Sequence, residues 1–134
     1  MRDAITRLDG FATWPCDEIN PIWRHGNLDH PDDEIPRSRA TPQVRAYIRA
    51  AFLRIWRQQG KLPFVVEKTC ANALRVSFVD AVLPEARFIH ILRDGYDVVA
   101  SARKRWLGEL EMPGLPYFIA KARYAPASDL PRYA

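Results

Sequence analysis

The chain has 134 residues, of which 48% are hydrophobic and 27% are charged. This length suits one domain, and the composition excludes a disordered chain because enough apolar side chains are present to offset the entropy lost on ordering. No apolar run reaches the roughly 20 residues of a membrane-spanning helix. Residues 1–7 mix acidic and basic side chains without an apolar stretch behind them, unlike a secretory signal. We therefore expect a cytoplasmic protein with no membrane contact.

The net charge of +4 is unevenly distributed. Residues 1–36 hold three basic and eight acidic side chains, whereas residues 37–61 hold seven basic and no acidic ones. A basic segment of this kind can attract a polyanion such as nucleic acid. Arg45, Arg49 and Arg57, however, fit the solvent face of an amphipathic helix. We therefore predict no nucleic-acid partner, with nucleic-acid binding through this segment as an alternative.

Metal and disulfide sites are not indicated. The two cysteines, Cys16 and Cys70, have no second pair or nearby histidine at metal-ligand spacing, so we expect two reduced thiols. His25 and His30 lie in an acidic, proline-rich stretch that is more typical of a solvated loop than of a metal centre. We predict no metal cofactor.

Residues 1–41 are expected to form an irregular, proline-rich segment that four apolar side chains attach to the rest of the protein. A helix is then predicted from Thr41, a good N-cap, with Pro42 at the first helical position, up to Gly60. Apolar side chains recur within it at steps of three and four residues. The four attaching residues are Trp14, Ile19, Ile22 and Trp23.

The order helix, strand, helix, strand, helix is predicted for a core over residues 42–106. Strands separated by helices of this length imply βαβ crossovers and a parallel sheet that is covered on both faces. The tail at 107–134 is expected to be irregular, with a helix near 116–124. After the first helix, the predicted elements are a strand at 63–68, a helix at 71–83 ended by Pro84, a strand at 87–92 and a helix from about 95 to 106.

Two cations follow the predicted strands, Lys68 after the first and Arg93 after the second. Ligands of open parallel sheets bind beyond the carboxyl ends of the strands, so these cations together favour an anionic ligand. Ser101, eight residues after Arg93, offers a hydroxyl to the same ligand. The alternatives are a surface pair of Arg93 with Asp97 and a Lys68 side chain that extends into solvent.

The stretch EKTCANALRVSFVDAVLPEARFIHILRDGYDVVASARKRW, residues 67–106, resembles the 3′-phosphate-binding part of the sulfotransferases. These enzymes use 3′-phosphoadenosine 5′-phosphosulfate. The resemblance implies a P-loop-like, three-layer α/β/α sandwich in which Arg93 and Ser101 bind the 3′-phosphate and Lys68 acts near the transferred sulfonate. It also implies a hydroxyl or amine acceptor on a small molecule, carbohydrate or peptide. A guanidinium suits phosphate because it binds two oxygens at once.

Two departures from that family qualify the expected activity. Cys70 stands where many cytosolic members have a histidine base, so no base is identified; Glu67 alternates to the face opposite Lys68. None of the six glycines opens the N-terminal Gly-rich loop that cradles the 5′-phosphosulfate. We therefore expect residues 1–134 to be a single partial sulfotransferase domain, either a fragment or a degenerate relative. The alternative is a non-catalytic nucleotide-binding or interaction module, and the exposed sheet edge of such a chain favours dimers or aggregates.

Overall fold

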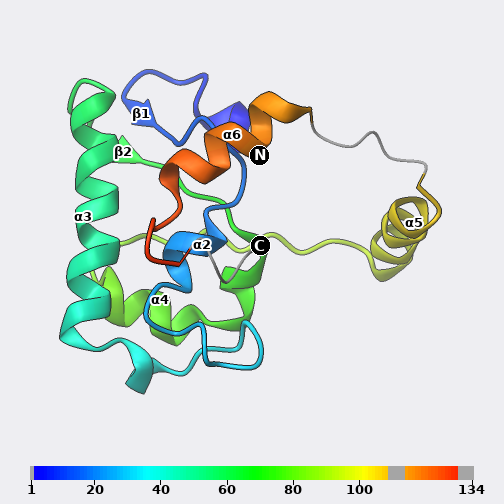
Figure 1. Ribbon diagram of the computed structural model, residues 1–134. Coiled ribbons are helices and arrows are strands. Elements are labelled where there is room, and N and C mark those ends of the chain that lie inside the picture. The colour runs from blue at the N-terminus through cyan, green and yellow to red at the C-terminus, as the bar shows by residue number, and fades with distance from the viewer. Residues whose placement is uncertain (1, 109–113, 130–134) are drawn as a thin grey trace.

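The structure is a computed structural model that describes residues 2–108 and 114–129 (Figure 1). The parts of the predicted tail at 109–113 and 130–134 lie outside the described residues. The elements are α1 (Arg2–Ile5), β1 (Phe11–Ala12), α2 (Asn20–Trp23), η1 (Arg37–Arg39), α3 (Pro42–Gln58), β2 (Phe64–Val65), η2 (Cys70–Leu74), α4 (Val76–Val82), α5 (Gly95–Trp106) and α6 (Leu115–Tyr124).

Helix α3 confirms the predicted first helix and is the longest described element. Its N-cap, Thr41, accepts a hydrogen bond at Oγ1 from the backbone N–H of Val44 at 3.3 Å. At the other end, the backbone N–H of Lys61 donates to the carbonyl of Trp56 at 2.8 Å, and Gly60 adopts a φ of +78°. This is the Schellman arrangement, in which a glycine takes the left-handed conformation at the helix end.

The core lies between α3, α4 and the proline-rich segment before them. The four tryptophan and isoleucine side chains of residues 14–23 that were expected to attach this segment are all buried. Ile48 of α3 and Phe78 of α4 are fully buried opposite them. The proline-rich segment is therefore a structural layer of the core, although its helix α2 has only four residues.

A two-stranded parallel sheet pairs β1 with β2, with Phe11 beside Phe64 and Ala12 beside Val65. Strand β2 confirms the strand predicted at 63–68, although the paired part is shorter. Strand β1 was not predicted, because two residues carry no alternating pattern. The connection between the strands includes α3, which packs against β2. The chain is thus an α/β protein with a parallel sheet.

The helix predicted at 71–83 is interrupted. A 3₁₀ helix ends at Leu74 and α4 begins at Val76, with Arg75 between them at a φ of −135°. The Arg75 side chain is buried in a polar network, and this tertiary position outweighs the local preference for a continuous helix. The end at Val82, just before Pro84, agrees with the prediction.

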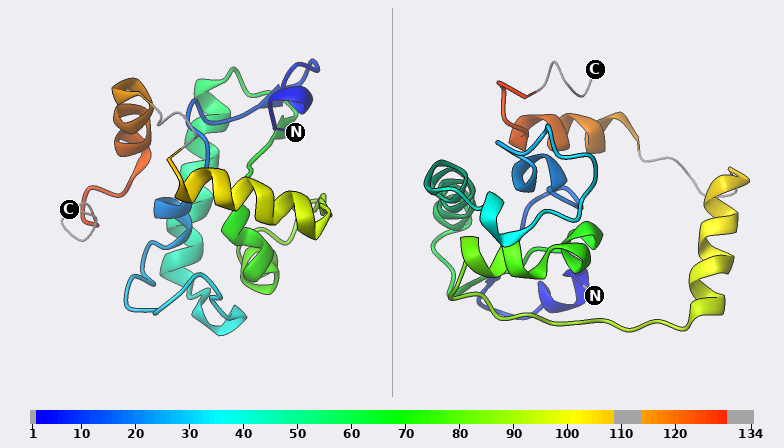
Figure 2. Two further views of the ribbon diagram at one scale, coloured as in Figure 1. Left: turned by 90° about the vertical axis from the view of Figure 1, so that its right-hand side faces the viewer. Right: turned by 90° about the horizontal axis from the view of Figure 1, so that it is seen from below.

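The strand predicted at 87–92 is not formed. These residues are extended and exposed, and the described sheet contains only β1 and β2. Helix α5 follows them as predicted, but none of its residues is buried. Figures 1 and 2 show residues 87–94 running away from the rest of the protein and α5 standing apart from it. We predicted that a crossover through a second strand at 87–92 would leave the sheet covered on both faces. This prediction is wrong, because residues 87–92 pair with no strand in the described chain.

Helix α6 confirms the helix predicted near 116–124 and packs beside the N-terminal half of the core. The Tyr117 hydroxyl donates to the carbonyl of Asp17 at 3.3 Å, and the Arg54 guanidinium lies 5.6 Å from the centre of the Tyr124 ring. None of the described helices combines the length and apolar character needed to cross a bilayer.

Candidate functional site

A group of polar side chains follows β2 at its carboxyl end, where the sequence predicted a ligand. Glu67 and Thr69 turn toward the interior, and Lys68 and Cys70 turn outward. The backbone N–H of Ile19 donates to Thr69 Oγ1 at 3.0 Å, which joins this strand end to the loop before α2. The alternation expected for a strand thus extends beyond the paired residues.

Lys68 forms ion pairs with two carboxylates of that loop. Its Nζ lies 3.5 Å from Asp17 Oδ2 and 3.4 Å from Glu18 Oε1, and its side chain is 36% exposed. Partial burial disfavours the ammonium, but the surrounding negative charges, Asp17 first, outweigh burial and raise the pKa of Lys68. Lys68 is therefore a cation that two ion pairs position at the edge of the fold, and its side chain does not simply extend into solvent.

Glu67 occupies the opposite, interior side of the strand end. Its carboxylate accepts hydrogen bonds from Asn72 Nδ2, at 2.9 Å, and from the Thr69 hydroxyl. Burial raises the pKa of Glu67 to about 7, although the Thr69 hydrogen bond and the charge of Arg75 oppose this rise. A carboxyl group that exchanges its proton near neutrality is a chemically active feature, but this one faces the core and away from Lys68.

Arg75 connects the interior group to the proline-rich segment. Its side chain is 0% exposed and donates from Nε to Asn72 Oδ1 at 2.9 Å, from Nη1 to Asp33 Oδ1 at 3.3 Å and from Nη2 to Asn20. Asp33 also pairs with Arg24 at 3.1 Å. Buried charges are tolerated only when they are paired and hydrogen-bonded, as they are here. The network therefore stabilises the geometry of the strand end.

Arg93 and Ser101 lie on the separate extension that ends in α5. Arg93 precedes the helix, its side chain is 56% exposed, and its Nε is 3.8 Å from Asp97 Oδ2. Asp97 and Ser101 are four residues apart in α5 and share one face of the helix, and Arg93 contacts this face through Asp97. The predicted surface pair of Arg93 with Asp97 is thus present, while a joint role of Arg93 and Ser101 stays a prediction.

The cations of the two predicted strand ends are not brought together in the single chain. Lys68 lies on the body of the protein, whereas Arg93 lies on the segment that leaves it (Figure 1). Asp94 caps α5 by accepting a hydrogen bond from the Tyr96 backbone N–H at 2.9 Å. Because the strand predicted at 87–92 does not pair with β2 in the described chain, nothing places the two predicted strand ends at one edge of the sheet.

The basic segment at 37–61 is largely engaged by other residues. Arg37 pairs with Asp80 at 2.7 Å and Arg49 with Glu85 at 2.7 Å, while Arg45 and Arg57 lie on the solvent face of α3 as predicted. Ion pairs of this kind reduce the positive potential available to a polyanion.

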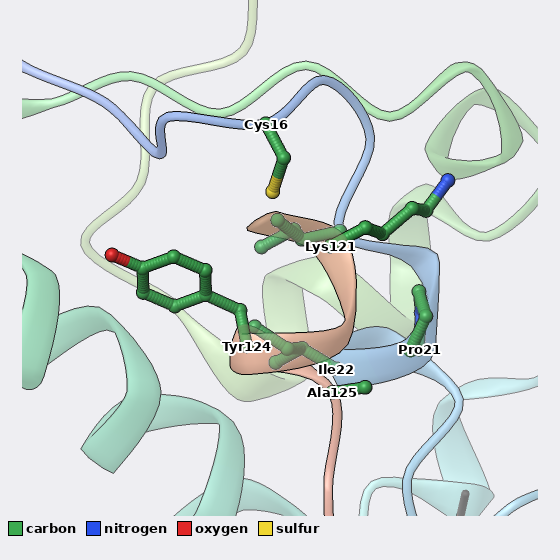
Figure 3. A pocket seen from close by; sticks show the side chains of 7 residues that line it. Cys16, Pro21, Ile22, Lys121, Tyr124 and Ala125 are labelled. Carbon is green, nitrogen blue, oxygen red and sulfur yellow. The ribbon is translucent and has the colours of Figure 1, made fainter. Parts of the chain in front are cut away.

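Neither a metal cluster nor the recess beside α6 offers a second polar ligand site in the described chain. Among residues 2–108 and 114–129, no cluster of three or more metal-ligating side chains is found. Figure 3 shows the recess between α6 and the segment around α2, where Cys16 lies near Lys121 and Tyr124. It has no room for a water-sized molecule. Burial raises the pKa of the Cys16 thiol, which makes it a packing residue and not a nucleophile.

Sequence reasoning missed the residues that hold the strand end, namely Asp17, Glu18, Asn20, Asp33 and Arg75. The first four lie 42 to 55 residues before Lys68 or Arg75, the partners that they meet only in the fold. The available signal was the acidic excess of residues 1–36 opposite the cations of later elements. That signal predicts attraction but not which residues pair.

The fold and this site describe an α/β protein with charged residues beyond a strand of a parallel sheet, the general place for an anionic ligand in this class. A family model described as "Sulfotransferase family" matches residues 5–123. The chain therefore belongs to the sulfotransferase family, in agreement with the resemblance of residues 67–106. Comparisons with curated proteins and with solved structures found no match.

Proposed function

We propose that this chain acts in sulfonate transfer from 3′-phosphoadenosine 5′-phosphosulfate to a hydroxyl or amine acceptor, on a P-loop-like three-layer scaffold. In this proposal Arg93 and Ser101 bind the 3′-phosphate and Lys68 neutralises charge near the sulfonate. The family match over residues 5–123 supports the class of reaction. The observation that carries the residue assignment is the Arg93–Asp97 contact, which holds Arg93 against the face of α5 that also carries Ser101.

The residues on α5 fit a phosphate group. The contact of Arg93 with Asp97 is long, at 3.8 Å, and the Arg93 side chain is 56% exposed, so its guanidinium can form a bidentate bond to phosphate oxygens. Ser101, one turn after Asp97, adds a neutral donor, and the first turn of α5 offers backbone N–H groups besides that of Tyr96, which Asp94 caps. Binding of the phosphate would displace Asp97, which costs little because that ion pair is exposed and long.

Lys68 has the charge and the position for the second role. Sulfuryl transfer, like phosphoryl transfer, gains from neutralising charge on the group in flight, and Lys68 supplies a cation whose raised pKa keeps it protonated at neutral pH. Asp17 and Glu18 hold its Nζ beside the strand end. The donor is the sulfonate source, and no metal enters the proposal.

Calorimetry with adenosine 3′,5′-bisphosphate tests the 3′-phosphate assignment. Replacing Arg93 with alanine removes a charge-assisted, bidentate contact, so we expect the affinity to fall about 10- to 100-fold. The Asp97→Asn variant removes the competing carboxylate and should bind the nucleotide more tightly, by about two- to fivefold.

The matched control is Arg103→Ala, in the last turn of the same helix. It removes the same charge from the opposite face, since Arg103 is two residues from Ser101, and should leave the affinity within about twofold apart from a nonspecific charge effect. Equal affinities for the wild type, Arg93→Ala and Arg103→Ala would exclude Arg93 from the site.

A further inference from the structure

Residues 87–107, here called the arm, form an apolar surface with no cover in the described chain. Ile89 is 66% exposed, Leu92 84% and Trp106 85%. Contiguous apolar surface of this extent on a monomer marks an interaction site or an aggregation site. The large apolar side chains of the arm, each about half exposed or more, are Phe88, Ile89, Ile91, Leu92, Tyr96, Val98, Val99, Trp106 and Leu107.

An apolar groove lies on the body of the same chain. It has a volume of about 460 Å³ and is bordered by Ala50, Leu53 and Trp56 of α3, Val65 of β2, and Leu83 after α4. Only Arg49 and Glu85, which pair with each other, add charge to its lining. The groove therefore matches the arm in apolar character.

One border of this groove is the strand β2, whose other edge is open. The backbone N–H groups of Phe64 and Val66 donate to β1, at 3.0 Å to Gly10 and 2.8 Å to Ala12. Alternation along a strand directs the backbone groups of Val65 toward the opposite edge. No strand in residues 2–108 or 114–129 pairs there. An open edge accepts an added strand.

The turn that starts the arm is held in place. Arg49 donates to the carbonyl of Val82 at 3.0 Å and pairs with Glu85 at 2.7 Å, and the backbone N–H of Ala86 donates to the carbonyl of Leu83 at 2.9 Å. From this turn residues 87–94 run away from α3, the helix that supplies most of the groove lining (Figure 2). The arm of one chain therefore does not cover the groove of the same chain, although both surfaces are apolar.

We propose that two copies of this chain exchange arms, so that residues 87–92 of each copy add as a parallel strand to β2 of the other. Helix α5 then covers the adjacent apolar surface. Each of the nine large apolar side chains of one arm removes roughly 60 to 120 Å² of surface from water when it is buried. Together they remove about 800 Å² per partner, which is the area that each partner loses in a standard stable interface. Exchange of an identical element is a common route to a dimer.

The exchange has a consequence for the site, and this consequence rests on the proposed function. A parallel strand beside β2 ends at the same edge as β2, so Arg93 of the partner subunit would follow it close to Lys68. The two halves of the proposed site would then come from different copies, because the single chain keeps them apart.

Sedimentation velocity of the full chain at about 1 to 100 μM, without nucleotide, tests the exchange. We expect a concentration-dependent dimer for the wild type. Ile89→Lys in the arm and Ala50→Glu in the groove should each yield monomers, because a buried unpaired charge is strongly unfavourable. Leu8→Lys is the matched control, since Leu8 is exposed outside both surfaces, and it should dimerise as the wild type does. Far-UV circular dichroism checks that every variant is folded.

A mixture of the two monomeric variants distinguishes exchange from other contacts. Ile89→Lys retains an intact groove and Ala50→Glu an intact arm, so the mixture should form a heterodimer through one exchanged arm. The exchange is overturned if the wild type is monomeric or if the two variants are dimeric. It is also overturned if the mixture stays monomeric at concentrations where the wild type is fully dimeric. A dimer that does not bind adenosine 3′,5′-bisphosphate contradicts the proposed function alone, whereas a nucleotide-binding monomer contradicts the exchange alone.

Discussion

Glu67 shows how the position of one residue in the fold changes its chemistry. It follows β2 directly, beside Lys68 in sequence, yet it turns into the interior whereas Lys68 meets the carboxylates of Asp17 and Glu18. Its interior position raises its pKa from an ordinary value of 4.5 to about 7, whereas partners outside raise the pKa of Lys68. Burial thus favours the neutral form of Glu67, whereas charge pairing favours the charged form of Lys68, and the pKa rises in both.

The raised pKa of Glu67 predicts a pH-dependent stability. Between pH 4.5 and 7 the unfolded chain loses this proton while the folded chain keeps it, so the free energy of unfolding should fall as the pH rises across this range. The Glu67→Gln variant keeps an uncharged amide at the same place and should lack this dependence. We expect the difference between wild type and variant to change by about 3 kcal/mol between pH 4 and 8.

Urea denaturation of both proteins at several pH values measures this difference. Other titrating groups are common to the two chains and cancel in the comparison. Parallel curves for wild type and variant would show that Glu67 titrates normally in the folded state.

At the scale of elements, α3 has the strongest local determinants. Thr41, Pro42 and Gly60 define its ends, and side chains at helical spacing define its buried face, including Val44, Ile48, Ala51 and Ile55. Each of these signals acts within a few residues, so the sequence predicts the helix to within one or two positions.

The N-cap of α3 is open to direct measurement. Replacing Thr41 with alanine removes the acceptor for the backbone N–H of Val44, so we expect the free energy of unfolding to fall by about 1 kcal/mol. Thr41→Ser keeps the acceptor and serves as the control, with a change of no more than a few tenths of a kcal/mol. Both values come from chemical denaturation, and an equal loss in the two variants would mean that the Thr41 methyl group, and not the cap, stabilises the helix.

The strand predicted at 87–92 illustrates the limit of local patterns. Its sequence, RFIHIL, has the β-branched and apolar character of a strand, but a strand forms only when another edge supplies its hydrogen bonds. The single chain offers these residues no such edge, and they remain extended and exposed. The arm exchange would supply that edge from a second copy.

At the scale of the whole molecule, a long-range contact joins Asp129, near the C-terminus, to the proline-rich N-terminal segment. His25 Nδ1 and Asp129 Oδ2 are 2.8 Å apart although 104 residues separate them, and the His25 ring lies tilted against Tyr47 of α3 with 3.7 Å between ring centres. This contact ties the segment after α6 to the core.

Loss of this contact should loosen α6. In Asp129→Ala we expect the backbone amides of α6 to exchange their hydrogens about 3- to 10-fold faster, because one partly buried hydrogen bond is removed. The control is Asp80→Ala, which removes an exposed partner of Arg37 far from α6 and should leave that exchange unchanged. Hydrogen exchange followed by mass spectrometry resolves the helix. Unchanged rates in Asp129→Ala would show that α6 is held by the Tyr117 and Tyr124 contacts instead.

The sequence by itself determined α3, α5, α6, the first strand of the predicted pair and membership of the sulfotransferase family, because caps, helical spacing and a contiguous motif are all local signals. It also placed Lys68, Arg93 and Ser101 as the candidate site, which stays a prediction. Only the tertiary structure decided that Arg75 lies buried among Asn20, Asp33 and Asn72, and that residues 87–92 find no partner strand within the described chain. These outcomes depend on which distant groups meet, since pairing energies are set by geometry that no short stretch of sequence contains.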